Sequence, residues 1–78
     1  PQVLRNVRVD QGGIDGAALL AEEIADAERD LGATGRVLVR SGGTEPLVRV
    51  MVEAPTDAEA RSVAEALAGA VAREIPLP

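Results

Sequence analysis

The chain has 78 residues and a formal net charge of -5, and it contains no cysteine, histidine or aromatic residue. A chain this short buries only about 60–65% of its unfolded surface, which supports one small domain with a single core. The missing residue types exclude disulfides, thiol chemistry, most zinc sites and base stacking on aromatic rings, and the acidic balance disfavours nucleic acid as a partner. Because the sequence has no apolar run as long as a membrane span, we expect a soluble single domain over residues 1–78.

The first predicted element is a strand over residues 3–9, VLRNVRV. Its β-branched residues Val3, Val7 and Val9 share one parity, which is typical of a strand with one half-buried face. Arg5 has the same parity and interrupts this apolar face.

A helix is predicted over Gly16–Leu31. The preceding stretch 10–16, DQGGIDG, has the composition of a turn, and Asp15 is the expected N-cap of the helix. Gly32 follows the helix at the position where glycine is favoured. The apolar positions step by four, three and four, so they form one stripe of Leu20, Ile24, Ala27 and Leu31.

Residues Val37–Arg40 and Leu47–Glu53 are predicted to form a β-hairpin in which Arg40 faces Leu47 across the loop. Alternation separates two faces of this hairpin, and the core face carries Val37, Val39, Val48 and Val50. A mixture of arginines and large apolar residues on the other face suggests that a ligand or another part of a larger protein docks there. That face carries Arg36, Leu38, Arg40, Leu47, Arg49 and Met51.

A second helix is predicted after Pro55. Thr56 and Glu59 form a T-x-x-E capping box, and Pro76 forbids continuation of the helix. The element order is therefore strand, helix, strand, strand, helix. This order predicts an α+β fold with a small antiparallel or mixed sheet and both helices on its valine face. The apolar positions of the second helix are Ala60, Val63, Leu67, Ala70 and Val71.

The loop Ser41–Pro46 has the composition of a phosphate-binding turn. Its two glycines permit backbone amides to point inward at an anion, and its threonine adds a hydroxyl donor. One arginine precedes the loop and another follows it on the same face, and guanidinium groups suit phosphate oxygens. The alternative is an ordinary hairpin loop, because these small residues are common in turns. The candidate phosphate-binding residues are Arg40, Gly42, Gly43, Thr44 and Arg49.

The stretch Gly35–Ala54, GRVLVRSGGTEPLVRVMVEA, resembles the C-terminal domain (domain 4) of the alpha-D-phosphohexomutases, whose phosphate-binding loop reads R-P-S-G-T-E-P with a second arginine further on. The likeness extends to PQVLRNVRV at the start and to the capped helix at the end, so it covers nearly the whole chain. Within the family, the T-E-P ending and the strand RVMVEA favour members that act on glucosamine phosphates, and members that act on mannose or glucose phosphates are the alternatives. The loop positions that match are Arg40, Gly43, Thr44, Glu45 and Pro46, and Arg49 matches the downstream arginine.

The resemblance implies a role for these residues. Arg40, Thr44, Arg49 and the loop amides would hold the substrate phosphate that is not transferred, while the sugar turns between two orientations. The phosphorylated serine and the Mg²⁺ of such enzymes belong to preceding domains, and nothing in this chain resembles either, so the chain alone is expected to be inactive. The implied protein is a cytoplasmic, magnesium-dependent isomerase with a phosphosugar substrate, and its preceding domains are partners of this one.

Two positions depart from the family loop. Ser41 stands in place of the proline, and Gly42 stands in place of the serine whose hydroxyl contacts the phosphate. A lost hydrogen bond to a charged ligand weakens binding by roughly 1.5–3 kcal/mol. Either the phosphate affinity is lower here, or Ser41 and an additional amide compensate.

Two other function classes are alternatives to a domain of a phosphohexomutase. A free-standing module that binds a phosphorylated metabolite without catalysis would need the same loop. A protein- or RNA-interaction domain is disfavoured by the negative charge and the missing aromatic residues. The acidic pairs Glu22–Glu23 and Asp57–Glu59 are expected to be solvated partners of helix N-termini, and no metal site is predicted.

Overall fold

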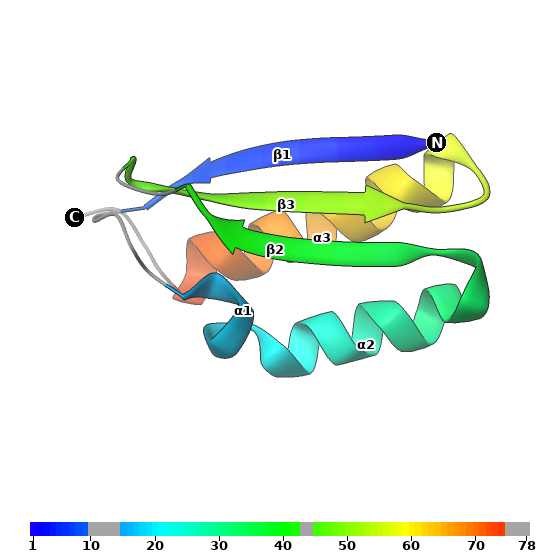
Figure 1. Ribbon diagram of the computed structural model, residues 1–78, viewed down its shortest axis with the longest axis horizontal. Coiled ribbons are helices and arrows are strands. Elements are labelled where there is room, and N and C mark those ends of the chain that lie inside the picture. The colour runs from blue at the N-terminus through cyan, green and yellow to red at the C-terminus, as the bar shows by residue number, and fades with distance from the viewer. Residues whose placement is uncertain (10–14, 43–44, 75–78) are drawn as a thin grey trace.

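The computed structural model describes residues 1–9, 15–42 and 45–74, and Figure 1 shows how their elements are arranged. The predicted turn at 10–14 and the predicted stop at Pro76 lie outside the described residues. The elements in chain order are β1 (Gln2–Arg8), α1 (Gly16–Leu19), α2 (Ala21–Leu31), a 3-10 turn (Gly32–Thr34), β2 (Arg36–Ser41), β3 (Leu47–Glu53) and α3 (Asp57–Glu74).

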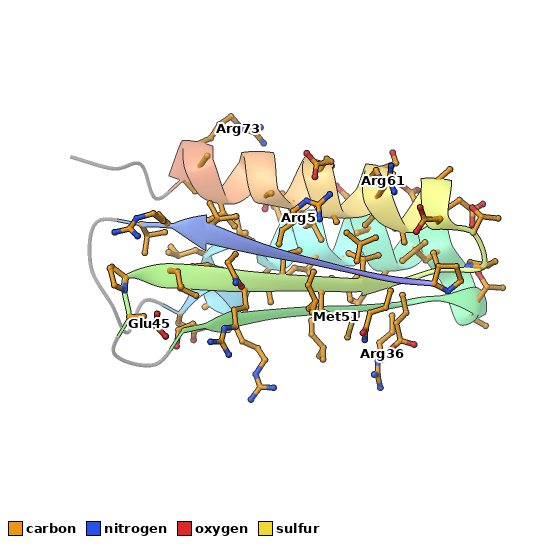
Figure 2. The ribbon with its side chains drawn as sticks, turned by 90° about the horizontal axis from the view of Figure 1, so that it is seen from above. Arg5, Arg36, Glu45, Met51, Arg61 and Arg73 are labelled. Carbon is orange, nitrogen blue, oxygen red and sulfur yellow. The ribbon has the colours of Figure 1, made fainter. Side chains whose placement is uncertain are left out.

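The strands form an antiparallel sheet in the order β1-β3-β2, so β3 is the central strand. The described helices cover one face of this sheet: α3 packs on β1 and β3, whereas α1 and α2 pack on β2 (Figure 1). Figure 2 shows α3 along one face and the opposite face of the sheet without a helix. The predicted α+β fold, with both helices on one face, is confirmed. None of the helices in the described ranges is long and apolar enough to cross a membrane.

The core lies between the sheet and the helices, and the central strand β3 contributes three fully buried valines to it. Val48, Val50 and Val52 are each 0% exposed, because their parity puts them on the side of β3 that faces the helices. Leu67 and Val71 of α3 are 2% and 0% exposed and close over them. The valine face is therefore the core face, as the alternation predicted.

Arg5 shares the parity of the core valines without disrupting the core. Its Nε donates to Oε1 of Glu65 on α3 at 2.6 Å, and Figure 2 shows the side chain directed toward that helix. The two side chains are 40% and 60% exposed, so the pair lies at the edge of the helix–sheet interface. Ion pairs at such exposure stabilise by about 1 kcal/mol or less.

The hairpin register differs from the prediction by two residues. Arg40 pairs with Arg49 rather than with Leu47, and β2 is one residue longer than predicted at each end. The difference arises at the tip, where the Gly42 N–H donates to the carbonyl of Leu47 at 2.9 Å and closes a shorter loop. A shift of two residues keeps every side chain on its face. The predicted faces are therefore correct although the predicted pairing is wrong.

The first helix is interrupted, whereas the sequence predicts one continuous helix. The break falls at Leu20, whose backbone adopts φ -108 and ψ 24 and whose side chain is 0% exposed. The bend thus coincides with the deepest side chain of this segment. Asp15 is the N-cap, as predicted, because its carboxylate accepts from the N–H of Ala18 at 3.1 Å.

The remaining helix ends follow the local prediction. Gly32 ends α2 with φ 60, in the left-handed region that favours glycine. The hydroxyl of Thr56 accepts from the N–H of Glu59 at 3.1 Å, which is the N-terminal bond of the predicted capping box.

Candidate functional site

The face of the sheet opposite the helices, here called the open face, carries the arginines of the predicted site. Figure 2 shows two of its side chains, Arg36 and Met51, projecting away from α3. Its charged strand residues are four arginines and one glutamate, so it has a net charge of +3 (4 − 1) in a chain of net charge -5. Antiparallel pairing aligns its residues in the rows Gln2–Glu53–Arg36, Leu4–Met51–Leu38, Asn6–Arg49–Arg40 and Arg8–Leu47.

Of the rows that span all three strands, the one nearest the hairpin tip has Arg49 at its centre. Arg40 is its direct partner on β2 and Asn6 is its direct partner on β1. Side chains directly opposite each other in an antiparallel pair have Cβ atoms about 4.5–5.5 Å apart, and like charges in that position are destabilising. The register therefore puts two arginines directly opposite each other on neighbouring strands, an arrangement that does not stabilise the folded chain by itself.

The two arginines are poorly neutralised by the protein. A guanidinium nitrogen of Arg49 lies 4.0 Å from Oε1 of Glu45, and the two side chains are 56% and 65% exposed. An ion pair of that length and exposure contributes about 1 kcal/mol at most. Within residues 1–9, 15–42 and 45–74, Arg40 forms no ion pair. The described residues therefore leave most of the positive charge of these two arginines uncompensated.

Arg8 is a third cation beside this pair that the sequence analysis did not select. It lies opposite Leu47 on the open face, which puts it diagonally across from Arg49, and diagonal neighbours are about 7–8 Å apart. The N–H of Val9 donates to the carbonyl of Pro46 at 2.8 Å, so the end of β1 is attached to the loop. Alternation in the sequence predicts which face of β1 carries Arg8, but it does not predict that β1 pairs with β3.

The described amides of the tip are bonded within the turn. The N–H of Gly42 donates to Leu47, the N–H of Glu45 donates to Gly42 at 3.3 Å, and the N–H of Leu47 donates to Glu45 at 2.8 Å. These three amides are therefore not available to a ligand. The amides of Gly43 and Thr44, which belong to the same prediction, lie outside the described residues.

Packing explains the glycine at position 42. A Cβ added there would lie 2.7 Å from Cγ of Leu47 and 3.2 Å from its carbonyl oxygen, so the Leu47 side chain would have to shift to admit one. Ser41, the other departure from the family loop, pairs with Val48 and is half-buried. Alternation puts Ser41 on the helix side of the sheet, opposite to Arg40, so its hydroxyl does not replace the missing serine.

A hollow lies between α2 and α3, and its charged lining is mostly acidic. This groove of about 290 Å³ is lined by the carboxylates Glu23, Asp26 and Asp30 and by one guanidinium, that of Arg73. An excess of carboxylates repels phosphate, so the groove is a poor anion site. The predicted acidic pairs lie in the first turns of α2 and α3, where they interact favourably with the helix dipole. The part of the chain that the structure describes holds no cluster of His, Cys, Asp or Glu suited to a metal ion.

Comparison with known proteins gives one consistent result. The family model described as phosphoglucomutase/phosphomannomutase, C-terminal domain, matches residues 4–70. A phosphoglucosamine mutase from Streptomyces avermitilis is 62% identical over 72 residues, which are 91% of this chain and 16% of that protein. A phosphoglucosamine mutase from Frankia alni is 56% identical over an alignment of 79 positions, which covers 100% of this chain and 17% of that protein.

A solved structure agrees with these sequence relatives. The structure of Aspergillus fumigatus N-acetylphosphoglucosamine mutase matches with a TM-score of 0.77 and 28% identity, over 95% of this chain and 15% of that one. The chain therefore spans about one sixth of the length of the relatives that it matches.

Proposed function

This chain belongs to the family of phosphoglucomutase/phosphomannomutase C-terminal domains, and from that premise we propose that it is the substrate-phosphate-binding domain of a phosphoglucosamine mutase. The complete enzyme would interconvert glucosamine 6-phosphate and glucosamine 1-phosphate for cell-wall precursor synthesis. The names of the relatives from Streptomyces avermitilis and Frankia alni support this choice among the hexose mutases.

The single observation that carries the proposal is the direct pairing of Arg40 with Arg49 on the open face. A phosphate monoester carries a charge of about -1.5 to -2 near pH 7 and presents three acceptor oxygens. Two adjacent guanidinium groups supply forked donors for those oxygens, and the bound dianion removes their mutual repulsion. Gly42, Gly43 and Thr44 form the rest of the proposed site, Gly42 by shaping the turn and the other two by donating to the phosphate.

In this proposal the chain binds and orients the substrate but does not react with it. The retained phosphate is anchored at the hairpin tip, which limits the positions that the sugar can take. The residues in the described ranges do not fit a Mg²⁺ site, so the magnesium of such enzymes is assigned to the preceding domains together with the phosphorylated serine. Phosphoryl transfer needs those groups on the opposite side of the substrate. Incubation of the 78-residue chain with glucosamine 6-phosphate is therefore expected to yield no glucosamine 1-phosphate.

A chemical-shift titration tests the site. Inorganic phosphate and glucosamine 6-phosphate are added separately to the ¹⁵N-labelled chain, with sodium chloride of equal ionic strength as the control. We expect the backbone shifts to concentrate at residues 40–44 and at Arg49, with weak affinity. Shifts confined to the α2–α3 groove, or no shifts at high millimolar ligand, would refute the proposed site.

A further inference from the structure

The open face carries an apolar row that the proposed phosphate site does not use. Leu4, Met51 and Leu38 lie side by side on β1, β3 and β2. Leu4 is 62% exposed and Leu38 is 41% exposed, whereas Met51 between them is only 8% exposed. Of the three large apolar side chains exposed in the described part of the chain, two belong to this row. Contiguous exposed apolar residues of this kind mark surfaces that other groups cover.

The surroundings of the row resemble a protein interface rather than a sugar site. The row is bordered on one side by Arg36 and Glu53, which form an ion pair at 2.8 Å, and on the other side by Arg40 and Arg49. An apolar centre within a charged rim rich in arginine is the usual composition of a protein–protein interface. A phosphosugar would find no hydrogen-bond partner among two leucines and a methionine.

The position of the chain start suggests what covers the row, and this step rests on the proposed function. The chain spans only 16–17% of the length of its relatives, so most of the complete protein would precede it. The carbonyl of Pro1 accepts from the N–H of Ala54 at 3.1 Å, which holds the start of the chain at the end of the sheet next to the Arg36–Glu53 row. A domain attached at Pro1 reaches the open face without passing around the helices.

We propose that the preceding part of the same protein docks on the open face over the Leu4–Met51–Leu38 row, through a surface with an apolar centre and a carboxylate rim. The carboxylate rim follows from the net charge of +3 on the open face. The same charge disfavours a second copy of this chain, because two such faces would repel each other.

Docking over the apolar row also affects the phosphate site. Residues two apart on a strand are separated by about 6.6 Å, so the apolar row is immediately adjacent to the row of Arg40 and Arg49. A docked surface would therefore exclude water from one side of a bound phosphate and strengthen its contacts with the two arginines.

Thiol labelling tests the docking without any phosphate present. The 78-residue chain has no cysteine, so Leu38→Cys or Leu4→Cys introduces one thiol at an exposed position of the row. Leu19→Cys is the matched control, because Leu19 is 54% exposed but lies on α1, on the helix side. Each variant is labelled with iodoacetamide as the 78-residue chain and as the full-length protein, and the modified peptide is quantified by mass spectrometry.

We expect labelling at positions 38 and 4 to be slower by about tenfold or more in the full-length protein, because an open state populated at 10% or less limits access. Labelling at position 19 should be the same in both. Equal rates at positions 38 and 4 in both proteins would overturn the proposal. Slow labelling that is already present in the 78-residue chain and is relieved by dilution would also overturn it, because a second copy would then cover the row.

The two proposals fail separately. If the row is unprotected in the full-length protein while the phosphate titration succeeds, only the docking is wrong. If the row is protected while the 78-residue chain binds no phosphate at the tip, the docking stands and the phosphate site is wrong.

Discussion

Replacing Arg40 with glutamine should raise the stability of the folded chain and weaken phosphate binding at the same time. Arg40 and Arg49 are directly opposite each other, with Cβ atoms about 5 Å apart. Two unit charges at that separation in water repel by about 0.8 kcal/mol, which is an upper limit because the flexible side chains can move their guanidinium groups further apart. Screening lowers this to about 0.5 kcal/mol at 0.1 M salt and to a small remainder at 1 M salt. Urea unfolding at the two salt concentrations measures the gain, which should be largest at low salt.

The effect on binding has the opposite sign and is larger. Loss of a hydrogen bond between charged groups weakens binding by roughly 1.5–3 kcal/mol, which corresponds to about 10- to 150-fold in affinity for phosphate. Isothermal titration calorimetry or chemical-shift titration of the Arg40→Gln chain with inorganic phosphate measures this loss of affinity.

Arg36→Gln is the matched control for both measurements. Arg36 lies on the same face, but its guanidinium is already paired with Glu53 at 2.8 Å, and the side chains are 63% and 42% exposed. Its replacement should lower the free energy of unfolding by up to about 1 kcal/mol and leave phosphate affinity unchanged. An Arg40→Gln chain that is destabilised as Arg36→Gln is, or that binds phosphate as tightly as the unmodified chain, would contradict a shared anion site at Arg40 and Arg49.

Three substitutions at glycines test the packing. Gly69→Ala lies inside α3, where the nearest atom to the new Cβ is 3.7 Å away, so helix propensity should stabilise the chain by about 0.5–1 kcal/mol in urea unfolding; a loss of stability would contradict this. Gly35→Ala puts a Cβ 2.6 Å from the carbonyl oxygen of Glu53, so we expect a loss of about 1–3 kcal/mol, and an unchanged melting temperature would show that the turn is not tight. Gly42→Ser should lose a similar amount because its Cβ meets Leu47, and adding Leu47→Ala should recover part of that loss; strictly additive effects would argue against the contact.

Those parts of the fold that depend on a few neighbouring residues could be predicted from the sequence. Alternation alone identified Val37, Val39, Val48 and Val50 as core residues, and all four are buried. Asp15 and Thr56 cap their helices because capping involves only residues within one turn. The resemblance to the C-terminal domain of the alpha-D-phosphohexomutases, which rested on the loop motif and its flanking strands, is confirmed by the family match over residues 4–70.

Features that depend on distant segments could not be predicted. The hairpin register was wrong by two residues because the bond from Gly42 to Leu47 shortens the loop, and the parity of the side chains is the same in both registers. The place of Arg8 beside the arginine pair depends on the strand order β1-β3-β2, on which local sequence carries no information. The break in the first helix coincides with the burial of Leu20 in the core, which involves residues distant in the sequence.

If Arg40 and Arg49 hold one anion together, the side-chain Nε–H resonances of both arginines should respond to it. Titration of the ¹⁵N-labelled chain with inorganic phosphate should move the Nε–H signals of Arg40 and Arg49 with the same midpoint, while that of Arg36 stays in place. Movement of only one of the two signals, or equal movement of the Arg36 signal, would contradict binding of one anion by both arginines.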